Sequence, residues 1–244
     1  MLSFFVFWVE KYCWKHVDGL ISVSQSIIDW YKFFFPTTNY ALILNSPLTK
    51  KTKFKKNSFL RKHFAIPSGS LIYVYVGLMV DGRALDYYTK AFVSQKTTSS
   101  LVLIGYGQKS ETLKKLSQNH PNIYFMDALP HEKLIYVLRG ADVGLCLIEN
   151  SSLSDFYSLP NKLLEYLFSD LKVICSEFPE MSKVVKSLGA GVTCKDNYDS
   201  FLQAFHQVEK EKASIMNYDL YQFSYVRQEQ LLFNFYKKIL GEEL

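Results

Sequence analysis

Between residues 70 and 195 the chain alternates short, continuous apolar runs with amphipathic segments. Runs that are apolar throughout are typical of strands buried on both faces of a parallel sheet, which helices then cover. The sequence therefore predicts a doubly wound α/β domain with a parallel sheet. The expected strands are residues 70–78, 100–107, 122–129, 142–148, 172–177 and 190–195. The expected helices between them are residues 84–95, 110–119, 131–141, 160–169 and 180–189.

The two ends of the chain continue this pattern. The N-terminal part contains two apolar runs that end at turn signals, with a helical segment between them that Pro36 ends. The C-terminal part has the pattern of two helices. The additional strands are expected at residues 17–24 and 40–47, and the additional helices at residues 199–212 and 218–240.

The first apolar run is LSFFVFWV, at residues 2–9. It is too short to span a bilayer and is followed at once by Glu10 and Lys11. It also lacks the basic region and the cleavage site of a signal peptide. Two interpretations remain: the run is the buried face of a helix, or it is an aromatic anchor at a membrane interface.

Composition limits the classes of partner. The 244 residues are 48% hydrophobic, which is enough for a sizeable core and unlike a disordered chain. The net charge of +5 is a mild excess that suits an anionic ligand or an anionic membrane surface and does not indicate nucleic acid. The four cysteines form no CxxC pair, which favours reduced, buried thiols in a cytoplasmic protein.

The basic segment at residues 50–62 has two interpretations. Its sequence, KKTKFKKNSFLRK, contains seven Lys or Arg residues. It is either a solvated linker that runs into a helix, or a surface that contacts an anionic membrane. The second interpretation would place the protein peripherally at the inner face of the cell membrane.

Doubly wound sheets bind ligands beyond the C-terminal ends of their strands, so the strand-to-helix junctions are the places to search. In the first junction Gly77 ends a strand, where a glycine lets the backbone approach a ligand closely. Arg83 follows just before the helix and is placed to reach a phosphate. The alternative is a turn glycine with a surface arginine.

The second and third junctions carry weaker signals. Gly105-Tyr-Gly107-Gln108 begins like a dinucleotide fingerprint, but position 110 is Ser where the third glycine is expected, so a tight turn is the alternative. Residues 126–130 contain no reactive group, although the backbone around Ala128 and Leu129 is placed to line a pocket. His131 is expected to be a surface or cap residue and not a catalyst.

The fourth junction is SLPNKLLEY, at residues 158–166. Pro160 is well placed at the start of a helix, whose free N–H groups and dipole attract an anion. Lys162 adds a full charge there. Glu165 shares a face with Asn161 and lies one turn deeper, where a carboxylate accepts hydrogen bonds from paired hydroxyls such as those of a ribose. These groups fit a nucleoside diphosphate; a Lys–Glu pair that only solvates the helix is the alternative.

The order of these junctions resembles the C-terminal, nucleotide-sugar-binding half of GT-B glycosyltransferases in the large retaining family 4. The resemblance runs from about residue 10 to residue 240. No single motif is decisive, but five in the right order are a strong indication. The segments that carry it are YVGLMVDGRALDYYTKAF, LVLIGYGQKSETLKKL, LRGADVGLCLI, SLPNKLLEYLFSDLKVICSEFPEM and SYVRQEQLLFNFYKKIL.

The resemblance implies a role for each site residue. Glu165 matches the second Glu of the family's Glu-x7-Glu motif, which binds the ribose. Arg83 matches a basic residue at the donor diphosphate, with Lys162 as a second cation, and Gly77 matches the glycine beside the phosphates. Residues around Ala128 and Leu129 match the loop that holds the base.

The chain departs from the family pattern in three ways. Tyr157 stands where the first Glu of the motif is expected, beside the donor sugar. Leu78 stands where the family often has Arg. Finally, the first Rossmann-like domain is largely missing: residues 1–47 are expected to be its remnant, residues 48–215 the donor-binding Rossmann-like domain, and residues 216–244 a helix that crosses back to the N-terminal domain.

The resemblance implies a glycosyltransferase that uses a UDP- or GDP-sugar and needs no metal or other cofactor, since the chain contains no Asp-x-Asp pair. The acceptor would be a glycan or a lipid-linked molecule, in bacterial cell-surface polysaccharide synthesis. A second hypothesis is a catalytically incomplete nucleotide-sugar-binding chain that needs a separate N-terminal domain protein. A third, a dinucleotide-dependent epimerase or oxidoreductase, is disfavoured by the absent third glycine.

Overall fold

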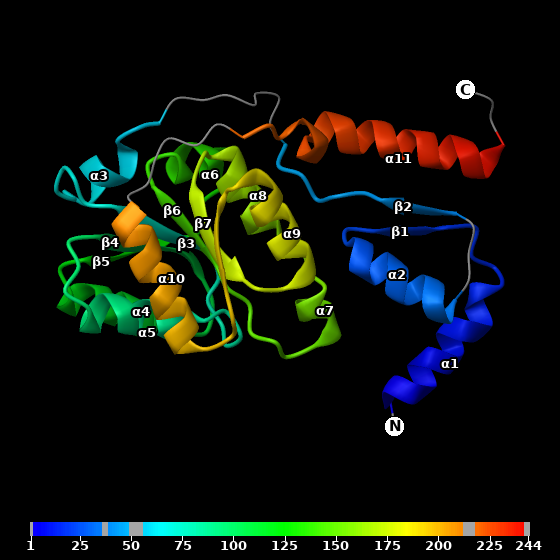
Figure 1. The fold of residues 1–244 in the computed structure, drawn as a ribbon, viewed down its shortest axis with the longest axis horizontal. Coiled ribbons are helices and arrows are strands. Elements are labelled where there is room, and N and C mark those ends of the chain that lie inside the picture. The colour runs from blue at the N-terminus through cyan, green and yellow to red at the C-terminus, as the bar shows by residue number, and fades with distance from the viewer. Residues whose placement is uncertain (1, 36–38, 49–55, 212–217, 242–244) are drawn as a thin grey trace.

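The computed structural model describes residues 2–35, 39–48, 56–211 and 218–241. Its centre is a parallel sheet of six strands in the order β5-β4-β3-β6-β7-β8, so the predicted doubly wound α/β fold is confirmed (Figure 1). The chain order reverses between β3 and β6, which makes this pair the topological switch point. The strands are β3 (Ile72–Leu78), β4 (Ser100–Tyr106), β5 (Ile123–Asp127), β6 (Val143–Cys146), β7 (Lys172–Ser176) and β8 (Gly191–Cys194).

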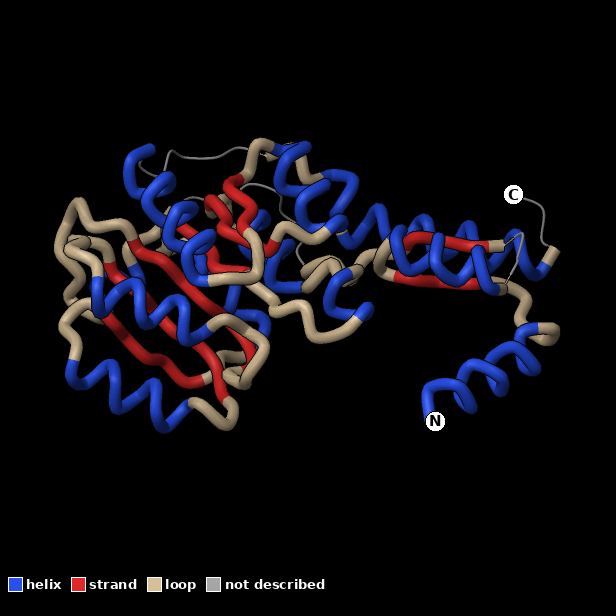
Figure 2. The backbone as a smooth tube through the Cα atoms, turned by 60° about the horizontal axis from the view of Figure 1, so that its bottom comes forward, coloured by secondary structure: helices blue, strands red, loops and turns tan. Residues whose placement is uncertain are grey.

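Helices cover both faces of this sheet (Figures 1 and 2). On β3, Val74 packs into the core on one face and Tyr75 into the core on the other, and both are fully buried. Burial on both faces explains why the strands are apolar throughout. The first face is covered by α3 (Phe59–His63), α6 (His131–Leu138), α8 (Asn161–Phe168) and α9 (Pro179–Leu188). The second face is covered by α4 (Leu85–Ser94), α5 (Ser110–Asn119) and α10 (Tyr198–Glu211).

The N-terminal part forms a second, smaller layer beside the main sheet (Figure 1). It comprises α1 (Leu2–Trp14), β1 (Leu20–Ser22), α2 (Gln25–Phe34) and β2 (Tyr40–Leu42), and β1 pairs with β2 in parallel. Near the C-terminus, η1 (Tyr221–Phe223) and α11 (Tyr225–Leu240) divide what the sequence predicted as one helix, because Ser224 caps α11. Helix α11 returns to this layer and packs on the backbone at Gly19, where a Cβ would lie 2.7 Å from Phe235.

Hydrogen bonds join the smaller layer to the main domain. The side chain of Glu180, at the start of α9, accepts hydrogen bonds from the Ser26 backbone N–H (2.9 Å) and from its hydroxyl (2.6 Å). Ser24 caps the same helix, α2, by accepting a hydrogen bond from the Ile27 N–H. Helix α11 is also joined to the chain after β2, since the Leu44 N–H donates to Gln228 Oε1 at 2.8 Å. The N-terminal end of α2 is therefore held at a defined place against α9.

Helix α1 forms where the apolar run 2–9 predicted a helix, but most of its described apolar side chains are not buried. Phe5 is 65% exposed, Trp8 52% and Tyr12 68%. The helix is held by aromatic contacts from Phe7 and Trp14 to α2 and the residue after it. The interpretation of residues 2–9 as a buried helix face is therefore wrong for Phe5 and Trp8, because the described chain supplies nothing to cover them.

Part of the basic segment has a structural role. Residues 50–55 lie outside the described residues, but Lys56 and Arg61 both approach Asp142, at 4.0 and 3.8 Å. Asp142 in turn accepts a hydrogen bond from the Ile72 N–H at the start of β3 (2.9 Å). These two cations therefore fix the N-terminal edge of the sheet. Among the helices that the structure describes, none is long and apolar enough to cross a membrane.

Strands β3 and β6 diverge at the switch point and form a fork, and the side chain of Tyr166 bridges the two strands there. Strands β3 and β6 pair only at two positions, of which Val74–Gly144 is the last. Beyond it, the Val76 N–H donates to Tyr166 Oη (3.0 Å), and Tyr166 Oη donates to the Leu145 carbonyl (3.2 Å). The ring lies against Gly144, where a Cβ would approach it to 2.4 Å. Tyr166 thus anchors α8 between the diverging strands.

We expect Tyr166→Phe to lower the free energy of unfolding by about 1–3 kcal/mol, because the buried Val76 N–H and Leu145 carbonyl lose their partner. Urea unfolding at neutral pH measures this loss. Tyr124→Phe is the matched control, since the Tyr124 hydroxyl donates to a carbonyl at the surface. Equal effects of the two changes would show that the fork needs no hydroxyl.

Candidate functional site

The candidate site lies beyond the C-terminal ends of β3, β5 and β6. Three segments meet there. They are Gly77 at the end of β3 with the loop that follows as far as Ala84, residues 128–131 between β5 and the start of α6, and the N-terminal end of α8. The loop after β6 adds the short helix α7 (Leu153–Phe156). This loop is tied to the first segment because the Glu149 N–H donates to the Gly82 carbonyl at 3.1 Å.

Lys162 lies at the centre of the site. It is the second residue of α8, whose N-cap position is Pro160 and has no side-chain cap, so the dipole of the helix end faces the site. Lys162 Nζ lies 4.3 Å from the centroid of the Tyr75 ring. A Cβ on Gly77 would come within 3.9 Å of this ammonium group, and the Gly77 φ of +128° disfavours any side chain. Gly77 therefore keeps the space beside Lys162 open.

Two cations lie near each other at this site, Lys162 and Arg83. Burial, and to a lesser extent the nearby charge of Arg83, lower the pKa of Lys162 to about 8, against the opposing influence of Cys146 and Glu165. Cys146 itself lies buried at the end of β6, and burial raises the pKa of its thiol to about 11. Because the two cations repel each other, an anion bound between them would be strongly favoured.

Arg83 has a partner that the sequence did not reveal. Its Nη1 lies 3.5 Å from Asp155 Oδ1, and both side chains are partly buried. Asp155 belongs to α7, which was not predicted. The signal was present in Ser152-x-x-Asp155, a capping-box pattern: Ser152 Oγ accepts from the Asp155 N–H and donates to its carboxylate.

The carboxylate of Asp155 is held ionised. Burial alone would raise its pKa, but hydrogen bonds from Ser152 and Ser151 and the charge of Arg83 together bring the pKa below its usual value. Both serine hydroxyls donate to Oδ2, at 2.7 and 2.8 Å, while Oδ1 faces Arg83. The orientation of the carboxylate is therefore fixed by its own helix.

Glu165 lies one turn deeper in α8 and is 8% exposed. Burial raises the pKa of its carboxyl, although His131 and Lys162 oppose this shift. His131 Nδ1 lies 3.7 Å from Glu165 Oε1. His131 is an exposed first residue of α6, as expected for a surface residue, but it also borders the site, which the sequence did not indicate because α6 and α8 are distant along the chain.

The remaining predicted residues are less closely gathered. Asn161 is exposed at the start of α8, and Ala128 is exposed after β5. Leu129 packs partly into the core beneath α6. These three residues border the same edge of the sheet.

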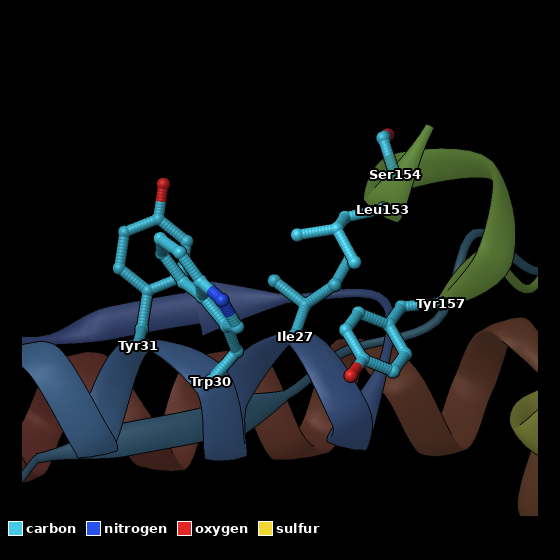
Figure 3. Close-up of a pocket in the computed structure, with 6 residues that line it drawn as sticks. All are labelled: Ile27, Trp30, Tyr31, Leu153, Ser154 and Tyr157. Atoms are coloured by element: carbon cyan, nitrogen blue, oxygen red, sulfur yellow. The ribbon is translucent and has the colours of Figure 1, made fainter. Parts of the chain in front are cut away.

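Tyr157 points towards α2 (Figure 3). Its side chain lines a pocket of about 380 Å³ between α2 and α7, together with Ile27, Trp30, Tyr31, Leu153 and Ser154. Among the described residues, no hydrogen bond or ion pair joins Tyr157 to Arg83, Lys162 or Glu165. Tyr157 therefore faces the N-terminal layer.

The glycine pair of the second junction forms a tight turn. A Cβ on Gly107 would lie 2.5 Å from the Met79 carbonyl, and one on Gly105 would lie 1.9 Å from the Gly77 carbonyl. The Lys109 N–H donates to the same Met79 carbonyl at 2.9 Å. These contacts favour the tight-turn interpretation over a dinucleotide fingerprint, since the glycines let two backbones touch.

The chemistry of the site is that of an anion receptor with a buried carboxylate beside it. Lys162, Arg83 and the end of α8 offer positive charge, and Glu165 offers hydrogen-bond acceptors. Within the described ranges there is no group of three or more His, Cys, Asp or Glu residues that could hold a metal ion.

Comparisons with known proteins identify the family and the fold. A model of the family described as glycosyl transferases group 1 matches residues 56–222. An uncharacterized glycosyltransferase of Methanocaldococcus jannaschii is 28% identical over 197 residues, which are 78% of this chain and 48% of that protein. The chain therefore spans about half the length of this curated relative.

Two solved structures share the fold. A sucrose-phosphate synthase of Thermosynechococcus elongatus superposes with a TM-score of 0.76 at 15% identity, over 97% of this chain and 62% of the other. The Anabaena protein HepE, solved in complex with UDP and glucose, superposes with a TM-score of 0.72 at 11% identity, over 95% of this chain and 66% of the other. Both support the GT-B architecture expected from the sequence.

We expect Lys162→Met to stabilise the chain at pH 7. Folding lowers the pKa of Lys162 from 10.5 to about 8. Between these pH values Lys162 is protonated in the unfolded state and neutral in the folded state. The free energy of unfolding therefore rises with pH across this window, and the cost of burying Lys162 is largest below it. Urea unfolding between pH 7 and pH 10.5 should show the variant's advantage shrinking as pH rises. Lys186→Met is the control, since Lys186 is 64% exposed; an unchanged pH slope in Lys162→Met would contradict the account.

Proposed function

The chain belongs to the glycosyl transferases group 1 family, and we propose that it binds a nucleoside-diphosphate sugar and transfers the sugar as a metal-independent hexosyltransferase of retaining family 4. The observation that carries this proposal is that Lys162, at the start of α8 and beside Gly77, lies close enough to Arg83 for the charge of Arg83 to lower its pKa, with Glu165 buried one turn deeper. The donor would be a UDP- or GDP-sugar, with no other cofactor.

Each side chain has a task in this proposal. Arg83, Lys162 and the end of α8 hold the diphosphate and stabilise its charge as the bond to the sugar breaks, as preorganised donors do in other transferases. Gly77 leaves room for the phosphates. Glu165 accepts hydrogen bonds from the ribose hydroxyls, and the backbone at Ala128 and Leu129 borders the base.

The division of the chain follows from the same proposal. Residues 48–215 would form the donor domain, residues 1–47 would belong to the N-terminal domain, and residues 216–244 would cross back to it. The acceptor would approach from the N-terminal side, where α2 and α7 face each other across the pocket of Tyr157 (Figure 3). A glycan or lipid-linked acceptor in bacterial cell-surface polysaccharide synthesis fits this placement.

A second candidate function is donor binding in partnership with a separate N-terminal domain protein. It is favoured by the exposed aromatic side chains of α1, such as Phe5 and Trp8, and by the sheet of β1 and β2, to which the described residues contribute two strands. A cytoplasmic protein that contacts the inner face of the membrane is compatible with either candidate.

Calorimetric titration of the chain with UDP, GDP and NAD tests the proposal. We expect UDP or GDP to bind and NAD not to bind. Glu165→Ala should weaken binding of the nucleoside diphosphate by about tenfold or more, because hydrogen bonds to a charged acceptor are worth roughly 1.5–3 kcal/mol. Glu132→Ala, an exposed acidic residue of α6, is the control. Binding of no nucleoside diphosphate would sink the proposal.

The affinity for the diphosphate should also depend on pH. Lys162 binds an anion only when protonated, and its pKa of about 8 means that it loses this proton in mildly alkaline solution. Binding of the UDP or GDP that the chain accepts should therefore weaken as pH rises from 7 to 9. Lys162→Met should abolish this dependence; a dependence that persists in the variant would assign it to another group.

A further inference from the structure

The charged side chains of the site form a continuous line across the end of the sheet. His131 lies 3.7 Å from Glu165, and Glu165 and Lys162 are close enough to shift each other's pKa. The charge of Arg83 lowers the pKa of Lys162, and Arg83 lies 3.5 Å from Asp155. The line therefore starts at α6, passes α8 and the loop after β3, and ends at α7.

The order of the side chains along this line can be compared with the order of the groups in an extended nucleoside-diphosphate sugar. If the ribose lies at Glu165 and the diphosphate between Lys162 and Arg83, as in the proposed function, the next group along the ligand is the sugar. The next side chain along the line is that of Asp155, from α7. We infer that Asp155 accepts hydrogen bonds from the donor sugar's hydroxyls and thus takes the position for which Tyr157 is unsuited.

The geometry of Asp155 suits this role. Two serine hydroxyls occupy Oδ2, at 2.7 and 2.8 Å, so the carboxylate cannot rotate freely. Oδ1 faces Arg83 from a distance of 3.5 Å, in a single long contact that leaves acceptor capacity for a hydroxyl. The side chain is 25% exposed, so a ligand can reach it.

Other carboxylates near the loop are less suitable. Asp81 and Asp86 both pair with Lys109, at 2.8 Å. Glu149 lies in the same loop as Asp155, but its charge acts on Tyr87 together with that of Asp196, on the side of α4 and α10. Glu149 is therefore a matched control: a carboxylate of the same loop that faces another way.

Tyr157 points towards the N-terminal layer. It lies two residues after Asp155 and lines the pocket between α2 and α7 with Trp30 and Ile27 (Figure 3). Helix α7 thus presents two sides: Asp155 towards Arg83, and Leu153 with Tyr157 towards the N-terminal layer. In the proposed function the Tyr157 hydroxyl would therefore lie closer to the acceptor than to the donor sugar.

This inference rests on the proposed function, and calorimetry separates the two. The probes are UDP and GDP, with UDP-glucose, UDP-galactose and GDP-mannose as their sugar conjugates. We expect Asp155→Ala to weaken binding of the accepted conjugate by about tenfold or more, as for the loss of a hydrogen bond to a charged group. Binding of the parent diphosphate should change less than about threefold or tighten, because a negative charge near the phosphates is removed.

Three further variants complete the test. Asp155→Asn keeps the shape of α7 and part of the hydrogen bonding, so its loss for the conjugate should be smaller than that of Asp155→Ala. Glu149→Gln and Tyr157→Phe should change neither ligand's affinity. Circular dichroism melts confirm that each variant is folded.

The contradicting results are distinct. Equal weakening of conjugate and diphosphate in Asp155→Ala would show that Asp155 only positions Arg83, and no effect on any conjugate would remove it from the sugar site. Either result overturns the inference and leaves the proposed function standing. Failure of the wild-type chain to bind any of the five probes overturns both.

Discussion

The hydroxyl of Tyr166 in the fork between β3 and β6 is the interaction on which the site depends. A parallel sheet must open at its switch point for a ligand to enter, and opening leaves backbone groups without ladder partners. Tyr166 supplies one oxygen to both strands, to the Val76 N–H and the Leu145 carbonyl. The same residue fixes α8 in position and rotation. Lys162, one turn earlier, and Glu165, the preceding residue, take their places from this anchor.

The site that results is electrostatically unfavourable without a ligand. Burial and Arg83 lower the pKa of Lys162, and burial raises that of Glu165. The fold offsets part of this cost through the Tyr75 ring beneath Lys162 and through Asp155 beside Arg83. Groups kept in such states are typical of binding and catalytic sites, where the ligand supplies the missing charge.

The fold and most of the site's location could be predicted from the sequence because they follow from local patterns. Apolar runs such as 70–78 indicate strands buried on both faces, and Pro160 indicates the start of a helix, which is α8. Contacts between distant segments could not be predicted: His131 beside Glu165, Asp155 beside Arg83, and Tyr157 facing α2. Helix α7 was missed because it has only one turn. The exposure of α1 could not be predicted from its own sequence, because burial of a helix depends on which other segments pack against it.

The most direct test of the account is a crystal structure of the chain with UDP or GDP bound. The account predicts that the diphosphate lies between Lys162 Nζ and the Arg83 guanidinium, beside Gly77, with the ribose hydroxyls within hydrogen-bond distance of Glu165 and with the Tyr166 hydroxyl still bridging β3 and β6. A nucleotide bound elsewhere, for example in the pocket between α2 and α7, or bound at the switch point without contact to Lys162 and Arg83, would contradict it.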